Sequence, residues 1–247
     1  NDEWNLISRT ILPVVRQSDI FPGAGTQTGT GDVVQSIFFS PKAPTASGWI
    51  WGAGPVLLLP TGSNDLLTTD KWGAGPTAVV LKQSNGWTRG VLANHLWSFA
   101  GDGDRADVNA TFLQPFLTYT TPTQWTFAVN TESSYDWENE QWSVPVNANA
   151  SKLVRLGNQL VSLGGGVRYM DEVSVNAANT IRVPSYALAD VMVEYALNSH
   201  VSLRLNVNNV TDTTYIRNVN NNGGRFNPGA PRAATLTRPT STPSIIW

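Results

Sequence analysis

The second half of this chain alternates between apolar and polar residues with a period of two. In 125–137 the odd positions read W-F-V-T-S-Y-W, whereas the even positions read T-A-N-E-S-D. Only a β-strand sends alternate residues to opposite faces. The same alternation recurs in 141–151, 160–170, 186–196 and 201–208. The pattern therefore predicts a run of strands, each with one apolar and one polar face.

Less regular runs extend this series to about twelve strands, and their connections alternate in length. The further strands are expected at 3–16, 32–40, 48–60, 72–83, 87–99, 108–120 and 231–238. Long connections follow the first, third, fifth, ninth and eleventh strands, and short ones follow the fourth, sixth, eighth and tenth. The second connection is intermediate in length, and the seventh is a short loop on the long-loop side. Membrane-spanning barrels have short turns at one end and long loops at the other. The sequence thus predicts an all-β fold, a transmembrane antiparallel up-and-down β-barrel formed as a single domain by residues 1–247.

The composition argues against several other classes of protein. Charged residues make up 14% of the chain, well below the quarter or so of a soluble domain. The net charge of -2 without a basic run disfavours nucleic acid as a partner. No cysteine is present, which excludes disulfides and thiolate metal sites. No apolar run approaches the 18 or so residues of a membrane-spanning helix.

The tryptophans sort into two belts at the strand ends. The pentapeptide WGAGP occurs at 51–55 and 72–76, and antiparallel neighbours would place Trp51 and Trp72 at opposite interfaces. The same rule assigns Trp4, Trp49, Trp51, Trp87, Trp125 and Trp247 to the periplasmic side, and Trp72, Trp97, Trp137 and Trp142 to the outer side. Aromatic girdles at both interfaces are typical of membrane barrels. A soluble Trp-rich carbohydrate-binding β-sandwich remains an alternative, but it does not predict the alternation in loop length.

The polar faces of the strands predict the residues that line the solute path. Phe112, Gln114 and Phe116 share one face, and Gln114 would mark it as the inner one; the alternative is that both rings face lipid. The other expected lining residues are Asn130, Glu132, Asn147, Asn149, Arg168, Asp190, Glu194, Arg204 and Asn206. Glu194 should face Arg204, and Asp190 should face Asn208. These charges can brace the barrel or bind solute, and bracing is the preferred interpretation because buried charges require partners.

Catalytic and metal sites are not predicted. Asp102, Asp104 and Asp107 resemble a calcium loop, but the twelfth position is Leu113 instead of a bidentate Glu. An outer-membrane hydrolase would need a Ser and His pair. The chain has two histidines, of which His200 falls in a short turn and His95 points away from Ser98. We therefore expect no enzyme activity, cofactor or metal.

Longer stretches of the sequence resemble two families. The stretches `NLISRTILPVV`, `GDVVQSIFFSPKAP`, `GWIWGAGPVLLLPT`, `RADVNATFLQPFLTYTT` and `NTESSYDWENEQWSVP` are similar to bacterial outer-membrane channels described as meta-pathway phenol-degradation transporters. This likeness covers about residues 1–168. It implies a barrel of about twelve strands that admits small hydrophobic or aromatic compounds.

From about residue 160 to 237 the chain resembles a different family. The stretches `LGGGVRYMDE`, `NTIRVPSYALADVMVEYAL`, `LRLNVNNVTDTTYI` and `NPGAPRAATLT` look like the last barrel strands of TonB-dependent siderophore receptors. The chain is thus interpreted as a hybrid, phenol-transporter-like in 1–165 and receptor-like in 166–247. The final `TRPTSTPSIIW` departs from the alternating, Phe-terminated last strand usual in such barrels.

Together these features predict a channel of the bacterial outer membrane for passive, porin-like uptake of small hydrophobic or aromatic compounds. The expected partners are the lipid bilayer, such a solute and, in cells, the barrel-assembly machinery. The alternatives are an engineered or natural hybrid barrel without a dedicated substrate, a siderophore receptor remnant that lacks its plug, the hydrolase, and the soluble β-sandwich.

Overall fold

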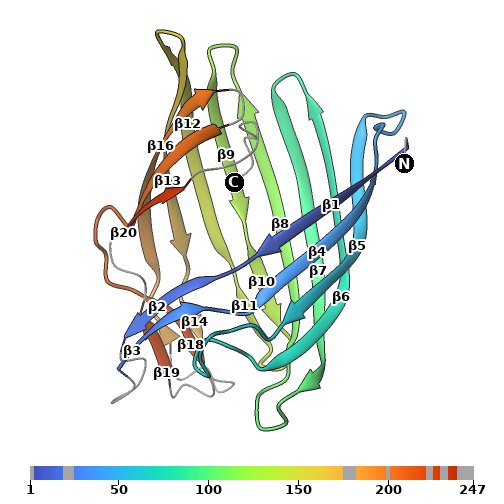
Figure 1. Ribbon diagram of the computed structural model, residues 1–247, viewed down its shortest axis with the longest axis vertical. Helices are drawn as coiled ribbons and strands as arrows, with labels where there is room; N and C mark the ends of the chain where they lie inside the picture. The colour runs from blue at the N-terminus through green and yellow to red at the C-terminus, as the bar shows by residue number, and fades with distance from the viewer. Residues whose placement is uncertain are drawn as a thin grey trace.

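The computed structural model describes residues 3–18, 25–174, 182–198, 201–220, 225–228 and 233–237. Its main element is one antiparallel sheet that curls around a central space (Figure 1). No helix within these ranges is long and apolar enough to cross a bilayer. Trp247, His200 and the segment after residue 237 lie outside the described residues.

Twelve strands follow one another in the sheet, in the order β1-β4-β5-β6-β7-β8-β9-β12-β13-β16-β17-β20. Their bounds are β1 Trp4–Ile11, β4 Val33–Pro41, β5 Trp49–Leu59, β6 Lys71–Ser84, β7 Trp87–Gly101, β8 Asn109–Thr120, β9 Trp125–Thr131, β12 Pro145–Leu156, β13 Gln159–Met170, β16 Tyr186–Asn198, β17 Val201–Asn208 and β20 Ala233–Thr237. These strands correspond one to one with the predicted twelve, which confirms the fold class. Within the described residues, no ladder joins β1 to β20.

Two of the strands continue past a short break. β10 (Ser133–Asp136) pairs with β8 in the register of β9, and β11 (Gln141–Ser143) pairs with β10 in the register of β12. The breaks fall at Glu132 and Val144. Pro145 begins β12 directly after the second break, and it has no N–H to offer the ladder. Segments 125–136 and 141–156 therefore each follow one long strand path, as the alternation predicts.

The short connections gather at the end of the sheet that is uppermost in Figure 1. Asn85 and Gly86 form the turn after β6, with φ angles of 50° and 80°. Positive φ at both central residues is the requirement of a type I′ hairpin, which Asn-Gly satisfies best. Gly157 has φ 61° at the first position of the turn after β12. Across this turn, Val154 lies opposite Val161, and Ala148 lies opposite Val167.

The long connections carry structure that the alternation did not predict. Three two-stranded ladders, β2–β3 (Val14–Ser18 and Thr26–Thr30), β14–β15 (Val173–Ser174 and Arg182–Val183) and β18–β19 (Ile216–Asn220 and Arg225–Pro228), lie at the opposite end of the barrel wall (Figure 1). The expected first strand at 3–16 is wrong at its end. Strand β1 stops at Ile11, and after Pro13, which lacks an N–H, the chain leaves the main sheet as β2.

The doubled WGAGP segment is explained by the register of β5 and β6. Gly73 lies opposite Leu58, and Gly75 lies opposite Val56. In mirror fashion, Gly52 and Gly54 lie opposite Val79 and Thr77. Leu58 is 6% exposed and Val56 is 0% exposed, because each covers the glycine of the partner strand. Each copy thus provides the space that the other strand's larger side chains fill.

Candidate functional site

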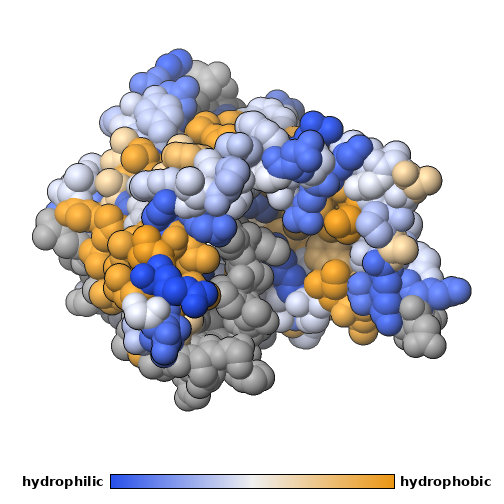
Figure 2. Space-filling view, turned by 90° about the horizontal axis from the view of Figure 1, so that it is seen from above, coloured by the Kyte–Doolittle hydropathy of each residue, from blue (hydrophilic) through white to orange (hydrophobic). Residues whose placement is uncertain are grey.

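The two faces of the sheet differ in the tryptophans and the polar side chains that they carry. All nine described Trp side chains lie on the outward face, and they are 36% to 52% exposed. They are Trp4, Trp49, Trp51, Trp72, Trp87, Trp97, Trp125, Trp137 and Trp142. Seen from the short-turn end, hydrophobic surfaces lie between hydrophilic ones around the rim (Figure 2). The residues on the other side of each strand form the inner face of the wall.

A row of polar side chains crosses the inner face from β9 to β13. Asn130 and Arg168 both lie directly opposite Asn147, which stands between them on β12. Asn147 donates from Nδ2 to Asn130 Oδ1 at 2.8 Å and accepts from Arg168 Nε at 2.9 Å. The three side chains therefore hold one another in a fixed order, and the guanidinium of Arg168 uses only its Nε in this row.

Two carboxylates of β16 face the same side. Glu194 lies opposite Arg204 and accepts from its Nε at 2.9 Å and its Nη2 at 2.5 Å. This confirms the predicted pair. Asp190 accepts from the backbone N–H of Asn209 at 2.7 Å. The β16–β17 ladder ends at Val191, so the predicted pairing of Asp190 with Asn208 is replaced by this backbone contact.

A groove of about 370 Å³ opens between these residues on the inner face. Its polar lining is made by Asn130, Glu132, Asn147, Asn149, Arg168, Asp190, Arg204, Asn206 and Asn208. Eight of the expected lining residues are thus brought together, and Glu194 joins them through Arg204. The exposed guanidinium of Arg168 projects among amide groups that can donate and accept hydrogen bonds.

The inner face on the other side of the wall is richer in apolar side chains, although Ser36, Thr77 and Asn94 also lie on it. Gln114 is 9% exposed and donates to Glu132 at 3.3 Å, so it lies inside as expected, and Phe112 and Phe116 share its face. They continue a surface formed by Phe38, Ile50, Val56, Leu58, Val79, Leu81, Leu92 and Leu96. The inner face therefore has a more apolar half, built by β4 to β8, and a more polar half, built by β9 to β17. These are called the apolar half and the polar half below.

Lys152 is a cation on the apolar outward face of β12. It lies opposite Leu163. Its ammonium donates to the carbonyl of Thr123 at 2.5 Å and lies 5.2 Å from the ring of Trp125. The aliphatic stem thus crosses the apolar surface while the charge reaches the short-turn end.

His95 and Ser98 are kept apart by the pleat of β7. His95 faces outward, where Nδ1 lies 2.7 Å from the hydroxyl of Thr111 and the ring lies 4.0 Å from that of Trp97. Ser98 lies on the inner face and donates to Asp107 at 3.1 Å. The structure does not place the two side chains as a nucleophile and base.

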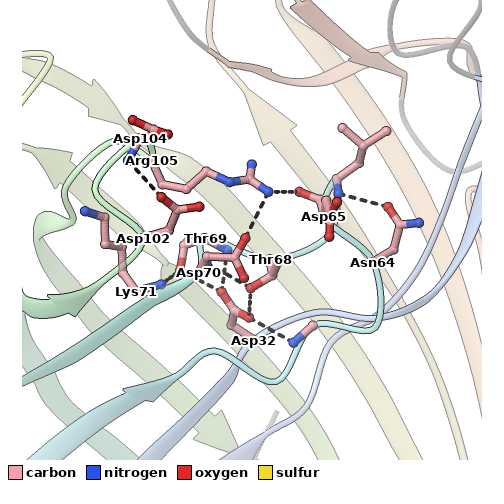
Figure 3. Close-up of polar contacts among 12 residues, drawn as sticks. Asp32, Asn64, Asp65, Thr68, Thr69, Asp70, Lys71, Asp102, Asp104 and Arg105 are labelled. Atoms are coloured by element: carbon pink, nitrogen blue, oxygen red, sulfur yellow. Dashed lines mark hydrogen bonds and ion pairs between the residues drawn. The ribbon is translucent and has the colours of Figure 1, made fainter.

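The long-loop rim contains an aspartate that the sequence did not single out. Asp32, between β3 and β4, accepts four hydrogen bonds from the loop after β5 (Figure 3). They come from Gly62 N at 3.0 Å, Thr68 Oγ1 at 2.7 Å, and Thr69 N and Oγ1 at 2.6 and 2.7 Å. Burial alone would raise the pKa of Asp32, but these bonds outweigh it and lower that pKa below its ordinary value.

Two ion pairs extend this rim. Lys71 Nζ lies 2.9 Å from Asp107 Oδ1, and Arg105 Nη2 lies 2.9 Å from Asp70 Oδ2. The hydrogen bond from Lys71, a second from Ser98 and the Lys71 charge lower the pKa of Asp107. Lys71 is thus paired with Asp107, one of the three aspartates that resemble a calcium loop in the sequence. In the part of the chain that the structure describes, no three His, Cys, Asp or Glu side chains are grouped to hold a metal ion.

Comparison with known proteins places the chain in a family. The family model described as TonB dependent receptor-like, beta-barrel matches residues 59–210. This range includes residues that the sequence analysis related to phenol-degradation transporters, and that half of the resemblance stays a prediction. The receptor-like half is supported by the match.

Three named receptors share part of the sequence. The catecholate siderophore receptor Fiu of Escherichia coli K12 is 33% identical over 81 residues, 31% of this chain and 11% of that protein. The ferrioxamine B receptor of Salmonella typhimurium is 43% identical over 60 residues, 23% of this chain and 8% of that protein. The probable TonB-dependent siderophore receptor PiuA of Acinetobacter baumannii is 44% identical over 55 residues, 22% of this chain and 7% of that protein. The matches therefore span about a tenth of these receptors' lengths.

Solved structures resemble the chain weakly. The open form of the ferric-catecholate import receptor Fiu from E. coli K12 gives a TM-score of 0.35 at 15% identity, over 95% of this chain and 48% of that one. PiuA from A. baumannii gives 0.35 at 15% identity, over 86% and 44%.

The family match extends across β6 to β17, which form both halves of the inner face. Proteins of this type reside in the outer membrane of bacteria, and so does this chain. With more than half of its residues matched, the chain belongs to the TonB-dependent receptor-like β-barrel family.

Proposed function

We propose that the chain forms the wall of an outer-membrane uptake path for small solutes that combine an aromatic body with hydrogen-bonding groups. The single observation that carries the proposal is the division of the inner face. Phe112 and Phe116 lie half-buried on the apolar half, and Arg168 with its asparagine partners lies on the polar half. A solute in contact with both halves would need apolar surface and polar substituents at once.

The names of the relatives are consistent with this class of solute. One similar receptor is named for catecholate siderophores, and a catechol is an aromatic ring that carries hydroxyl groups. We favour passive entry through this wall, driven by the solute gradient. Energised uptake of a ferric chelate is the second candidate, because the family model is that of TonB-dependent receptors.

Flux through the protein reconstituted in liposomes tests the proposal. Catechol or phenol should enter faster than a sugar of similar size. Replacing Phe112 and Phe116 by Asp should reduce entry of the aromatic solute more than entry of a small ion, because two charges would replace the apolar surface. Arg168→Gln should reduce entry of a benzoate more than entry of phenol, since it removes the cation of the polar half.

Matched substitutions separate the solute path from general damage. Phe116→Leu and Phe127→Leu each remove one ring, from the inner face of β8 and the outward face of β9. Only the inner change should lower aromatic flux. Equal flux in all folded variants would reject the aromatic lining. Tight binding of a ferric catecholate without any flux would instead favour the energised receptor.

A further inference from the structure

Among the described side chains on the outward face of the main sheet, every charged one is a cation. They are Lys82, Arg89 and Lys152. All three lie toward the short-turn end. Lys82 comes three residues before Asn85, and Arg89 comes three residues after Gly86. The outward face therefore has a positive charge near one membrane interface.

Lys82 and Arg89 lie directly opposite each other on β6 and β7. Opposed residues on one face have Cβ atoms about 4.5 to 5.5 Å apart, and two like charges at that spacing repel each other. The Lys82 ammonium lies 5.9 Å from the ring of Trp49. The Arg89 side chain forms no hydrogen bond or ion pair with any described residue. A bound anion would relieve the repulsion between the two cations.

An apolar groove of about 610 Å³ begins at Trp87 and Leu117, which neighbour Arg89 on the outward face. It lies over β8, β9, β12 and β13. Its floor contains the small residues Ala148, Ala150 and Gly165, and larger side chains rise beside them. These are Trp87, Leu117, Tyr119, Phe127, Val129 and Val167. Leu117, at one end of the groove, lies directly opposite Arg89.

The sheet register gives the groove its direction. One row of opposed outward residues runs from Arg89 through Leu117, Val129 and Ala148 to Val167. Arg89 is three residues from its short turn, whereas Val167 is nine residues beyond Asn158. Four strand spacings give a length of about 19 Å. The groove thus starts at the interface and rises into the hydrocarbon region.

We propose that Lys82 and Arg89 bind the phosphate of an anionic glycerophospholipid, and that one of its acyl chains occupies this groove. The charge of the pair is complementary to a phosphodiester. The groove continues from it over an apolar surface in the direction that an acyl chain takes. Trp87, beside Arg89 on the same face, lies at the level where indole rings meet lipid headgroups.

Native mass spectrometry of the purified full chain tests this site. Micelles containing equal amounts of phosphatidylglycerol and phosphatidylcholine supply the lipids. The wild-type chain should retain phosphatidylglycerol preferentially. Lys82→Gln and Arg89→Gln should each weaken retention by roughly fivefold, the effect expected for one cation near an anionic lipid. Ala148→Phe, which fills the groove without changing charge, should also release the lipid.

Arg155→Gln is the matched control, because Arg155 lies near the same end but on the inner face. It should retain the lipid, and far-UV circular dichroism should show unchanged strand content in every variant. Equal retention of both lipids, or an equal loss in Arg155→Gln, would overturn the proposal. Displacement by excess inorganic phosphate would also overturn it, because the anion site would then be independent of the acyl groove.

Discussion

Pro55 and Pro76 lie directly opposite each other between β5 and β6. Neither has a backbone N–H to donate. Each of these strands has a second neighbour, and both of those ladders are interrupted near the prolines. Between β4 and β5 the paired residues skip from Ser36 to Phe39, and between β6 and β7 they skip from Ala74 to Thr77. The paired prolines therefore create two symmetric interruptions in the central part of the wall.

We predict that glycine is required beside each interruption. A Cβ at Gly75 would lie 1.7 Å from the carbonyl oxygen of His95, and one at Gly54 would lie 2.0 Å from that of Ile37. Gly75→Ala and Gly54→Ala should each lower the free energy of unfolding by about 1–3 kcal/mol, the usual cost of overpacking. Urea unfolding in lipid vesicles measures this. Gly165→Ala, whose nearest contact would be 3.2 Å, should cost less; an equal cost would contradict the steric explanation.

The Glu194–Arg204 pair should show energetic coupling. Glu194 has a side-chain exposure of 8% and Arg204 one of 27%, so removal of either leaves a poorly solvated charge. Each Ala substitution should reduce unfolding stability, and the double change should cost less than the sum by about 1–3 kcal/mol. A double-mutant cycle measures this difference. Strict additivity would show that the two charges do not stabilise each other.

Acidification should release the loop after β5. The pKa of Asp32 is lower in the folded chain than its ordinary value of 3.8. Its contribution to stability is therefore complete above pH 3.8 and is lost as the pH falls through the folded pKa. Hydrogen exchange in 60–70 should stay slow from neutral pH down to that range and then rise. In Asp32→Asn, exchange should already be fast at neutral pH; slow exchange there would show that the carboxylate is dispensable.

The two Trp belts should lie at headgroup depth on opposite sides of the bilayer. Variants that retain only Trp72 or only Trp87 should both be quenched most by labels near the headgroups, because indole rings prefer that region. Depth-dependent fluorescence quenching in vesicles measures the position of each ring. Full exposure of both rings to an aqueous quencher would contradict the membrane orientation.

The strands could be predicted because the features that define them lie close together in the sequence. Alternation fixes which residues share a face, and a two-residue turn such as Gly157 and Asn158 fixes the register. The Glu194–Arg204 contact follows from the same two features, alternation and turn position. It forms although the β16–β17 register shifts between Ala196 and Asn198.

The rim could not be predicted in this way. Asp32 bonds to residues 30 to 37 positions away, and loop residues have no periodic pattern that would reveal such partners. The groove on the outward face was also missed. It arises from the side-chain sizes of Ala148, Ala150 and Gly165 on adjacent strands, which only the register brings together.

The division of the inner face also makes the wall modular. Its apolar half comes from strands that end at Thr120, and its polar half begins with Trp125. A single exchange of coding sequence in the 121–124 turn would therefore replace one half as a complete unit. The exchanged half would need to preserve the β8–β9 ladder and the contact of Gln114 with Glu132. Recombination at this turn would thus exchange one lining surface for another without changing each residue separately.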